Sequence, residues 1–192
     1  MPGVVVVAGP SGSGKSHLVD VLGWTPLRLD DFYREIDEPG LPMSSLGIPD
    51  WDDPRSWDHE AALAAIRSLC STGRAEVPEY DIALSRRTGS RELIVEGQHF
   101  IAEGLFANEV LAVCREEGLL TDAIVLARPR LVTFWLRLTR DLREARKSPL
   151  TLVRRGWRLL RDDSRIIAEA VAAGCRPLAP RRARAALRAL GR

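Results

Sequence analysis

The sequence predicts a single α/β domain spanning residues 1–192, in which a doubly wound, mostly parallel sheet carries helices on both faces. Short apolar runs alternate along the chain with helical patterns, and this alternation is typical of a parallel sheet. The length of 192 residues suits one such domain and is too short for two. Apolar residues make up 45% of the chain and charged residues 28%, as in ordinary globular proteins.

Four apolar runs predict the main strands. The run from Val4 to Ala8 is almost entirely valine, as expected of a strand that is buried on both faces. The other expected strands cover residues 26–29, 93–95 and 123–127, with a weaker one at 176–178. Expected helices cover residues 15–22, 58–71, 101–117, 130–146 and 148–173. The helix over 58–71 has Asp58 as N-cap and Gly73 just beyond its end.

Two segments depart from this alternation. Residues 34–91 predict an insertion on the substrate side, irregular up to residue 57 and ending in a polar hairpin or other polar excursion over 74–91. Residues 137–156 predict a basic lid. The Ala/Arg-rich end after Pro180 predicts a solvated helix.

Several function classes are not expected. The longest apolar runs span four to six residues, far short of the ~20 that a membrane helix needs. The first residues lead directly into a strand and do not resemble a secretory signal. Three cysteines without metal-like spacing predict free thiols. We therefore expect a cytoplasmic protein.

The charge is unevenly divided along the chain. Residues 1–127 carry 10 basic and 21 acidic side chains, whereas residues 128–165 carry 12 basic and 4 acidic ones. Such a division suits a site where a metal ion meets a polyanion. Two solvated faces that neutralise each other are the alternative interpretation.

The segment after the first strand carries the strongest motif. Residues 9–16 read GPSGSGKS and fit the pattern G-x-x-x-x-G-K-[ST] between a strand and a helix. This pattern predicts a P-loop, in which backbone amides and a helix N-terminus surround phosphate groups. Lys15 is expected to reach the β- and γ-phosphates, and Ser16 to bind Mg²⁺. The candidate nucleotide-binding residues are Gly9, Ser11, Gly12, Ser13, Gly14, Lys15, Ser16 and His17, although no partner pattern gives His17 a role.

Two acids are expected beside the P-loop. Asp30 follows the second predicted strand and Glu96 follows the third, and open α/β sheets bind ligands at the carboxyl ends of their strands. Asp30 is expected to accept a proton from an attacking hydroxyl. Glu96 is expected to hold Mg²⁺ together with Ser16, with Asp30 as a further candidate ligand. Each acid is alternatively an ordinary solvated strand end.

Basic residues provide a third component. Arginines at 137, 140, 143 and 146 lie on one helical stripe, where they can neutralise a triphosphate. Arg137 and Arg140 are the best candidates, with a solvated face as the alternative. Gln98 also follows the third predicted strand and is a candidate contact for the acceptor, although a structural loop amide is the simpler interpretation.

These motifs together resemble the uridine kinase family of P-loop nucleoside kinases over residues 3 to 147. The resemblance rests on residues 9–16, the motifs Asp30-Asp31-Phe32-Tyr33, Asp50-Trp51-Asp52-Asp53-Pro54, Pro78-Glu79-Tyr80-Asp81 and Glu96-Gly97, and the residues Arg137 and Arg140-Asp141. It implies a P-loop kinase fold, ATP and Mg²⁺ as cofactors, and a small nucleoside-like acceptor. It further implies that Asp30 activates the 5′-hydroxyl, Asp52 holds the ribose and Tyr80 approaches the base. Arg137 would face the acceptor, and Arg140 the ATP phosphates.

The sequence departs from the family where the base would be read. Ile82 stands where the family usually has an aromatic residue, and Ser85 where it has a histidine. The family's arginine–glycine–arginine lid appears as Ala145-Arg146-Lys147. A kinase for another small alcohol or a sugar phosphate therefore remains an alternative, as does a nucleotide-dependent switch or nucleic-acid-binding module. We do not expect membrane or nucleic acid as a partner, and the oligomeric state stays open.

Overall fold

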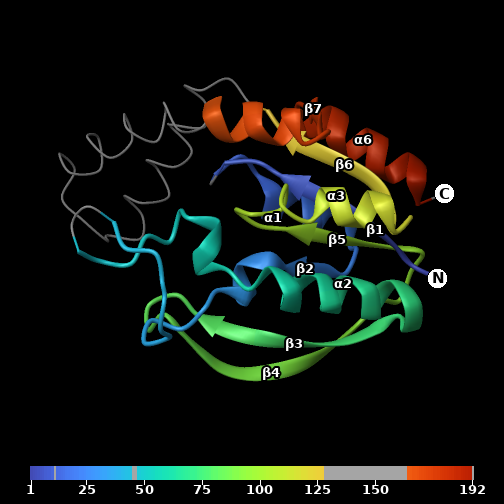
Figure 1. Ribbon diagram of the computed structural model, residues 1–192. Coiled ribbons are helices and arrows are strands. Elements are labelled where there is room, and N and C mark those ends of the chain that lie inside the picture. Colours follow the sequence, from blue (N-terminus) through green and yellow to red (C-terminus); the bar gives the residue numbers. More distant parts are fainter. Residues whose placement is uncertain (11, 45–46, 128–163, 192) are drawn as a thin grey trace.

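A central parallel sheet organises the computed structural model, which describes residues 1–10, 12–44, 47–127 and 164–191. The strands have the order β2-β5-β1-β6-β7, and every neighbouring pair is parallel (Figure 1). Their bounds are β1 (Gly3–Ala8), β2 (Pro26–Arg28), β5 (His99–Glu103), β6 (Leu120–Leu126) and β7 (Arg176–Leu178). The predicted mostly parallel α/β sheet is confirmed.

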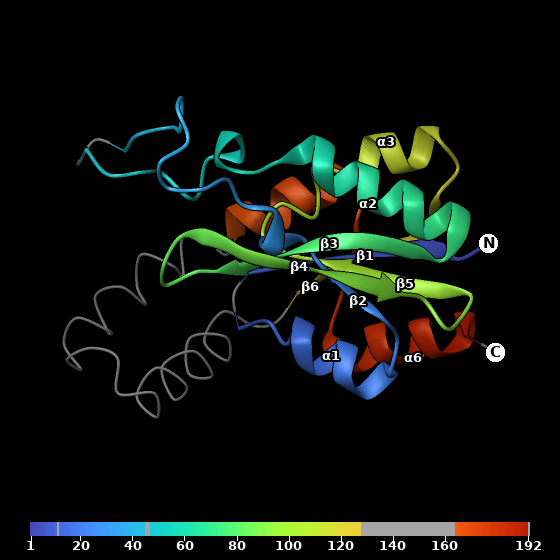
Figure 2. The same cartoon turned by 90° about the horizontal axis from the view of Figure 1, so that it is seen from below.

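Helices cover both faces of this sheet (Figure 2). The helices α2 (His59–Thr72) and α3 (Leu111–Glu116) lie on one face, and α1 (Lys15–Leu22) and α6 (Pro180–Leu190) lie on the other. Each face of the sheet has its own hydrophobic core, and alternate residues of β1 pack into these two cores. Val4 and Val6 pack on the α2 side, whereas Val5 and Val7 pack on the α1 side. This double burial explains why β1 is apolar without interruption.

A separate antiparallel hairpin lies beside α2. It consists of β3 (Arg74–Asp81) and β4 (Arg86–Ile94), as expected of the polar hairpin in this region. Two short 3₁₀ helices, η1 (Leu29–Phe32) and η2 (Pro54–Ser56), precede α2. The predicted caps of α2 are confirmed, because the Asp58 side chain accepts a hydrogen bond of 3.0 Å from the Ala61 amide and Gly73 has a φ of 74°.

Two predictions in the middle of the chain are wrong. Leu93 and Ile94 end β4 of the hairpin instead of forming a strand of the central sheet. The central strand is β5, which begins at His99, in the region where a long helix over 101–117 was expected. Only the short helix α3 forms within that range.

The C-terminal part closes the second face. Helix α6 buries Ala183 and Leu187 in the core that lies on the α1 side of the sheet. Residues 164–172 are helical, whereas the expected helix over 130–146, most of the one over 148–173 and the basic lid over 137–156 lie outside the described residues. In the described ranges, no helix has the length and apolarity needed to cross a bilayer.

Candidate functional site at the carboxyl edge of the sheet

The loop between β1 and α1 has the backbone shape of a phosphate cradle. Gly9, Gly12 and Gly14 have φ values of 145°, 77° and 99°, in a region that side chains other than hydrogen disfavour. Gly14 also caps α1, where no side-chain hydrogen bond covers the helix start. A helix N-terminus of this kind attracts phosphate through its amides and its dipole.

The Lys15 side chain lies over this loop. Its Nζ donates hydrogen bonds of 2.7 Å to the Gly9 carbonyl and 3.4 Å to the Pro10 carbonyl. Ser16 and His17 are exposed in the first turn of α1, whereas Ser13 is buried beneath the loop. The remaining loop candidate, Ser11, lies outside the described residues.

Asp30 is fixed at the same edge by the chain that follows β5. The Leu105 amide donates a hydrogen bond of 2.9 Å to its Oδ1. The approach is so close that a Cβ atom added to Gly104 would lie 2.7 Å from this oxygen. A glycine at 104 is therefore required for Asp30 to occupy its position.

Glu103 is the site residue that the sequence analysis missed. It ends β5, where it is in register with Val7 of β1 and Arg28 of β2. Burial raises the pKa of its carboxyl, while the nearby Lys15 charge lowers it and Asp30 raises it. Glu103, Lys15 and Asp30 therefore lie close together at the carboxyl ends of three adjacent strands.

The prediction that Glu96 and Gln98 join this edge is wrong. The Gln98 carbonyl accepts a hydrogen bond of 2.8 Å from the amide of Gly3, the first residue of β1. Both residues therefore precede β5 at the amino edge of the sheet, where their side chains are exposed. The dipeptide Glu103-Gly104 occupies the place expected for Glu96-Gly97, which shares its sequence.

An aromatic wall adjoins Asp30. The Tyr33 ring lies 5.7 Å from the Trp51 ring and 5.9 Å from the rings of both Tyr80 and Phe106. Tyr33 donates a hydrogen bond of 3.1 Å to the Trp51 carbonyl, and Tyr80 donates one of 3.1 Å to the Arg34 carbonyl. The first bond lies within the 33–52 segment, and the second joins this segment to the hairpin.

Two acidic residues near this wall affect the pKa of Tyr33. Burial raises that pKa far above its ordinary value, and the charges of Asp30 and Asp52 raise it further. Asp52 itself is exposed. Asp30 and Asp52 thus both lie near the Tyr33 ring. Trp57, by contrast, is buried and donates a hydrogen bond of 2.7 Å to the Leu29 carbonyl, which anchors η1.

The tip of the hairpin closes one side of this surface. The Ile36 amide donates a hydrogen bond of 3.0 Å to the Ser85 carbonyl, and Arg86 pairs with Asp37 at 2.9 Å. Ile82 at the tip is 70% exposed. The two positions that depart from the family pattern, Ile82 and Ser85, therefore lie in a turn that contacts the 34–38 segment.

The oxygen donors at this edge suit Mg²⁺. Magnesium is usually held by one or two carboxylates together with phosphate oxygens and water, so a dense cage of protein ligands is not required. Ser16, Asp30 and Glu103 provide such donors beside the phosphate cradle. No group of three or more histidine, cysteine or acidic side chains suited to a metal occurs in the described ranges.

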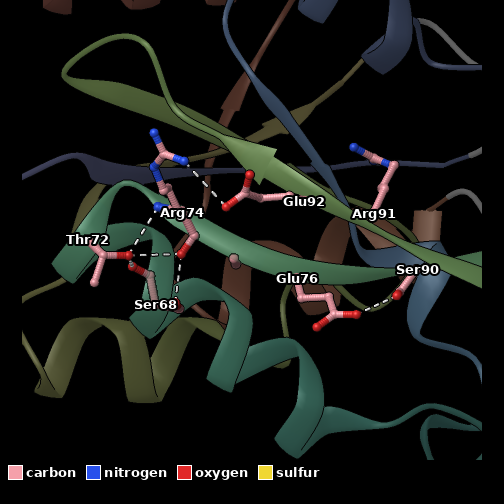
Figure 3. Close-up of a pocket in the computed structure, with 8 residues that line it drawn as sticks. Ser68, Thr72, Arg74, Glu76, Ser90, Arg91 and Glu92 are labelled. Carbon is pink, nitrogen blue, oxygen red and sulfur yellow. Dashed lines mark hydrogen bonds and ion pairs between the residues drawn. The ribbon is translucent and has the colours of Figure 1, made fainter.

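A hollow of about 500 Å³ lies away from this edge, between the end of α2 and the hairpin (Figure 3). Most of its polar groups are paired with each other. Arg74 contacts Glu92 at 3.5 Å and Ser90 donates a hydrogen bond to Glu76, while the Ser68 hydroxyl donates one of 2.7 Å to the Arg74 carbonyl (Figure 3). The first two pairs join β3 to β4, and the Ser68 bond attaches the hairpin to α2.

Known proteins resemble the chain in sequence. No family model matches it. A uridine kinase from Deinococcus deserti is 27% identical over 161 residues, covering 79% of this chain and 74% of that protein. A uridine kinase from Shewanella pealeana is 26% identical, covering 73% of this chain and 70% of that protein. The resemblance to the uridine kinase family is confirmed.

Solved structures establish the fold. A protein from Silicibacter sp. TM1040 that is described as a fructose transport system kinase matches with a TM-score of 0.61 at 20% identity, covering 94% of this chain and 89% of that chain. Phosphoribulokinase from Rhodobacter spheroides matches with a TM-score of 0.51 at 14% identity, covering 90% and 67%. The fold is that of the P-loop kinases. Arg137 and Arg140, which the uridine kinase resemblance singles out, lie outside the described residues.

Proposed function

We propose that this chain is an ATP- and Mg²⁺-dependent kinase that transfers the γ-phosphate to the 5′-hydroxyl of a nucleoside of the uridine or cytidine type. The observation that carries the proposal is the position of Asp30, held by the Leu105 amide beside Glu103 and between the phosphate cradle and the aromatic wall. A general base at this position has the phosphate cradle on one side and the aromatic wall, with Asp52 nearby, on the other.

Each group then has a defined task. Lys15 and the loop amides bind the phosphates, and Asp30 accepts the proton of the attacking hydroxyl. Ser16 and Glu103 would hold Mg²⁺, which neutralises charge on the β- and γ-phosphate oxygens when it is bound. Asp52 would bind the ribose hydroxyls, and Tyr80 with its neighbours would pack on the base. Arg137 would face the acceptor, and Arg140 the ATP phosphates.

The experiment is an acceptor panel with purified protein, ATP and Mg²⁺, read by ADP release and by mass spectrometry of the product. We expect a phosphorylated nucleoside to form much faster than ATP is hydrolysed without an acceptor. Faster phosphorylation of a sugar phosphate or another small alcohol would favour a kinase for that acceptor. The departures from the family pattern at Ile82 and Ser85 are the reason to test these acceptors. ATP turnover that yields no phosphorylated acceptor would contradict both.

A further inference from the structure

Arg28 lies at the carboxyl edge of the sheet. Neither the motifs nor the proposed function assigns a role to its positive charge. It ends β2, two residues before Asp30, and its side chain is exposed. Leu27 and Leu29 on either side pack into the α2 core, so the alternation of a strand turns Arg28 toward the α1 face. Glu103 faces the same way, because the preceding Ala102 packs into the α2 core.

The sheet order gives Arg28 a defined place relative to Lys15. Strand β5 lies between β2 and β1, so Glu103 at its end is flanked by Arg28 on one side and by the start of the Lys15 loop on the other. The Arg28 charge lowers the pKa values of both Glu103 and Asp31, against the effect of their burial. The guanidinium is therefore near enough to act on groups at this edge.

Arg28 also differs from most arginines around it in its contacts. Seven other arginines before residue 128 form ion pairs, namely Arg34, Arg55, Arg67, Arg74, Arg86, Arg87 and Arg91. Within the part of the chain that the structure describes, Arg28 forms no hydrogen bond or ion pair. An exposed guanidinium of this kind has its donors available for an anion.

We propose that Arg28 contacts the γ-phosphoryl group from the β2 side of the sheet edge while Lys15 contacts it from the loop side. This proposal rests on the proposed function. The acceptor oxygen forms a bond to the γ-phosphorus as the bond to the β–γ bridging oxygen breaks; the hydroxyl proton passes to Asp30 and ADP leaves. Arg28 takes no proton, and its planar guanidinium binds two phosphoryl oxygens as their charge is redistributed.

The test compares Arg28→Ala and Arg28→Lys with Arg188→Ala, an exposed arginine near the end of α6. Calorimetry in Mg²⁺ gives the affinities for ADP and for the β,γ-imido analogue of ATP, and steady-state assays give kcat for transfer to uridine. For Arg28→Ala we expect unchanged ADP affinity, a roughly tenfold loss of preference for the triphosphate analogue, and a fall in kcat on the order of 100-fold. Arg28→Lys should recover part of kcat.

The outcomes separate this proposal from the proposed function. Arg28→Ala with the nucleotide preference and kcat of the wild type would overturn the role of Arg28. A wild type that phosphorylates no acceptor would overturn the proposed function, while the comparison of ADP with the triphosphate analogue would still decide on Arg28. A wild type with neither transfer nor a preference for the analogue would contradict both. An unchanged melting temperature in Arg28→Ala, expected for an exposed side chain, separates these effects from misfolding.

Discussion

The Leu105 amide donates a hydrogen bond of 2.9 Å to Oδ1 of Asp30, which ties the turn after β2 to the turn after β5. This bond joins segments 75 residues apart and fixes the carboxylate in front of the phosphate cradle. In the described part of the chain, Oδ2 of Asp30 has no hydrogen bond, so it is the oxygen that can accept a proton. The site therefore depends on two strand ends that meet only in the folded chain.

Gly104→Ala tests this contact. The added methyl group would lie 2.7 Å from Oδ1 of Asp30 and must displace it. A displacement of about 1 Å costs on the order of 100-fold in rate, so kcat for transfer should fall by this factor while ADP affinity stays unchanged. Gly97→Ala is the matched control, because nothing lies within 4 Å of a Cβ atom there. Equal kcat values in the two variants would refute the requirement for glycine at 104.

Glu103→Gln and Glu96→Gln distinguish the two Glu-Gly pairs. We expect Glu103→Gln to lower kcat by about 100-fold and to raise the Mg²⁺ concentration needed for half-maximal rate, because a metal-facing carboxylate is lost. Glu96→Gln should change neither value more than about twofold, as an exposed residue at the opposite edge. Titration of Mg²⁺ at saturating ATP measures both. The reverse pattern would place the metal at Glu96.

The pH dependence of stability provides a test without substrate. Burial raises the pKa of Glu103 above its ordinary value of 4.5, so the folded chain holds that proton more tightly than the unfolded chain does. Stability contributed by the protonated carboxyl is present below that ordinary value and is lost as the pH rises through the folded-state pKa. Urea unfolding from pH 4.5 to 8 should therefore show Glu103→Gln gaining stability relative to wild type as the pH rises. A Glu103→Gln variant that loses stability relative to wild type as the pH rises would contradict the pKa shift.

The aromatic wall is tested at Tyr80. Its ring lies 5.9 Å from that of Tyr33, and base–aromatic stacking contributes roughly 1–3 kcal/mol. Tyr80→Ala should raise the KM for the nucleoside about tenfold or more and leave the KM for ATP unchanged. Tyr80→Phe keeps the ring and loses the hydroxyl contacts with the Arg34 carbonyl and the Ser85 side chain, so we expect a change within about threefold. Equal effects on both KM values would argue for a structural role.

Local signals explain which parts of the fold could be predicted from sequence. Helix α1 follows a glycine-rich turn whose positive φ values only glycine adopts readily, and its predicted bounds, Lys15 to Leu22, are confirmed. Helix α2 begins one residue after Asp58 and ends before Gly73, both of which act as caps. In such elements the deciding interactions lie within a few residues along the chain.

Local signals do not locate β5, the third strand of the central sheet along the chain. Residues 93–95 and 100–102 are both runs of three apolar residues followed by a Glu-Gly pair, and periodicity alone does not separate them. The difference lies in the folded chain. Leu93 is buried and Ile94 is 43% exposed, as in a hairpin with one exposed face, whereas Phe100, Ile101 and Ala102 are all buried. The pairing of β4 with β3, which decides the matter, is a tertiary contact.

The Asp30→Asn variant tests whether Asp30 is the base that accepts the hydroxyl proton. The amide oxygen of asparagine can still accept the Leu105 hydrogen bond, so the geometry should persist while the base is removed. We predict that the variant binds ATP and Mg²⁺ like the wild type and loses transfer to uridine by about 10²- to 10⁴-fold, whereas Asp31→Asn, at the adjacent buried acid, keeps transfer within a few-fold. Transfer by Asp30→Asn at the wild-type rate would contradict the account.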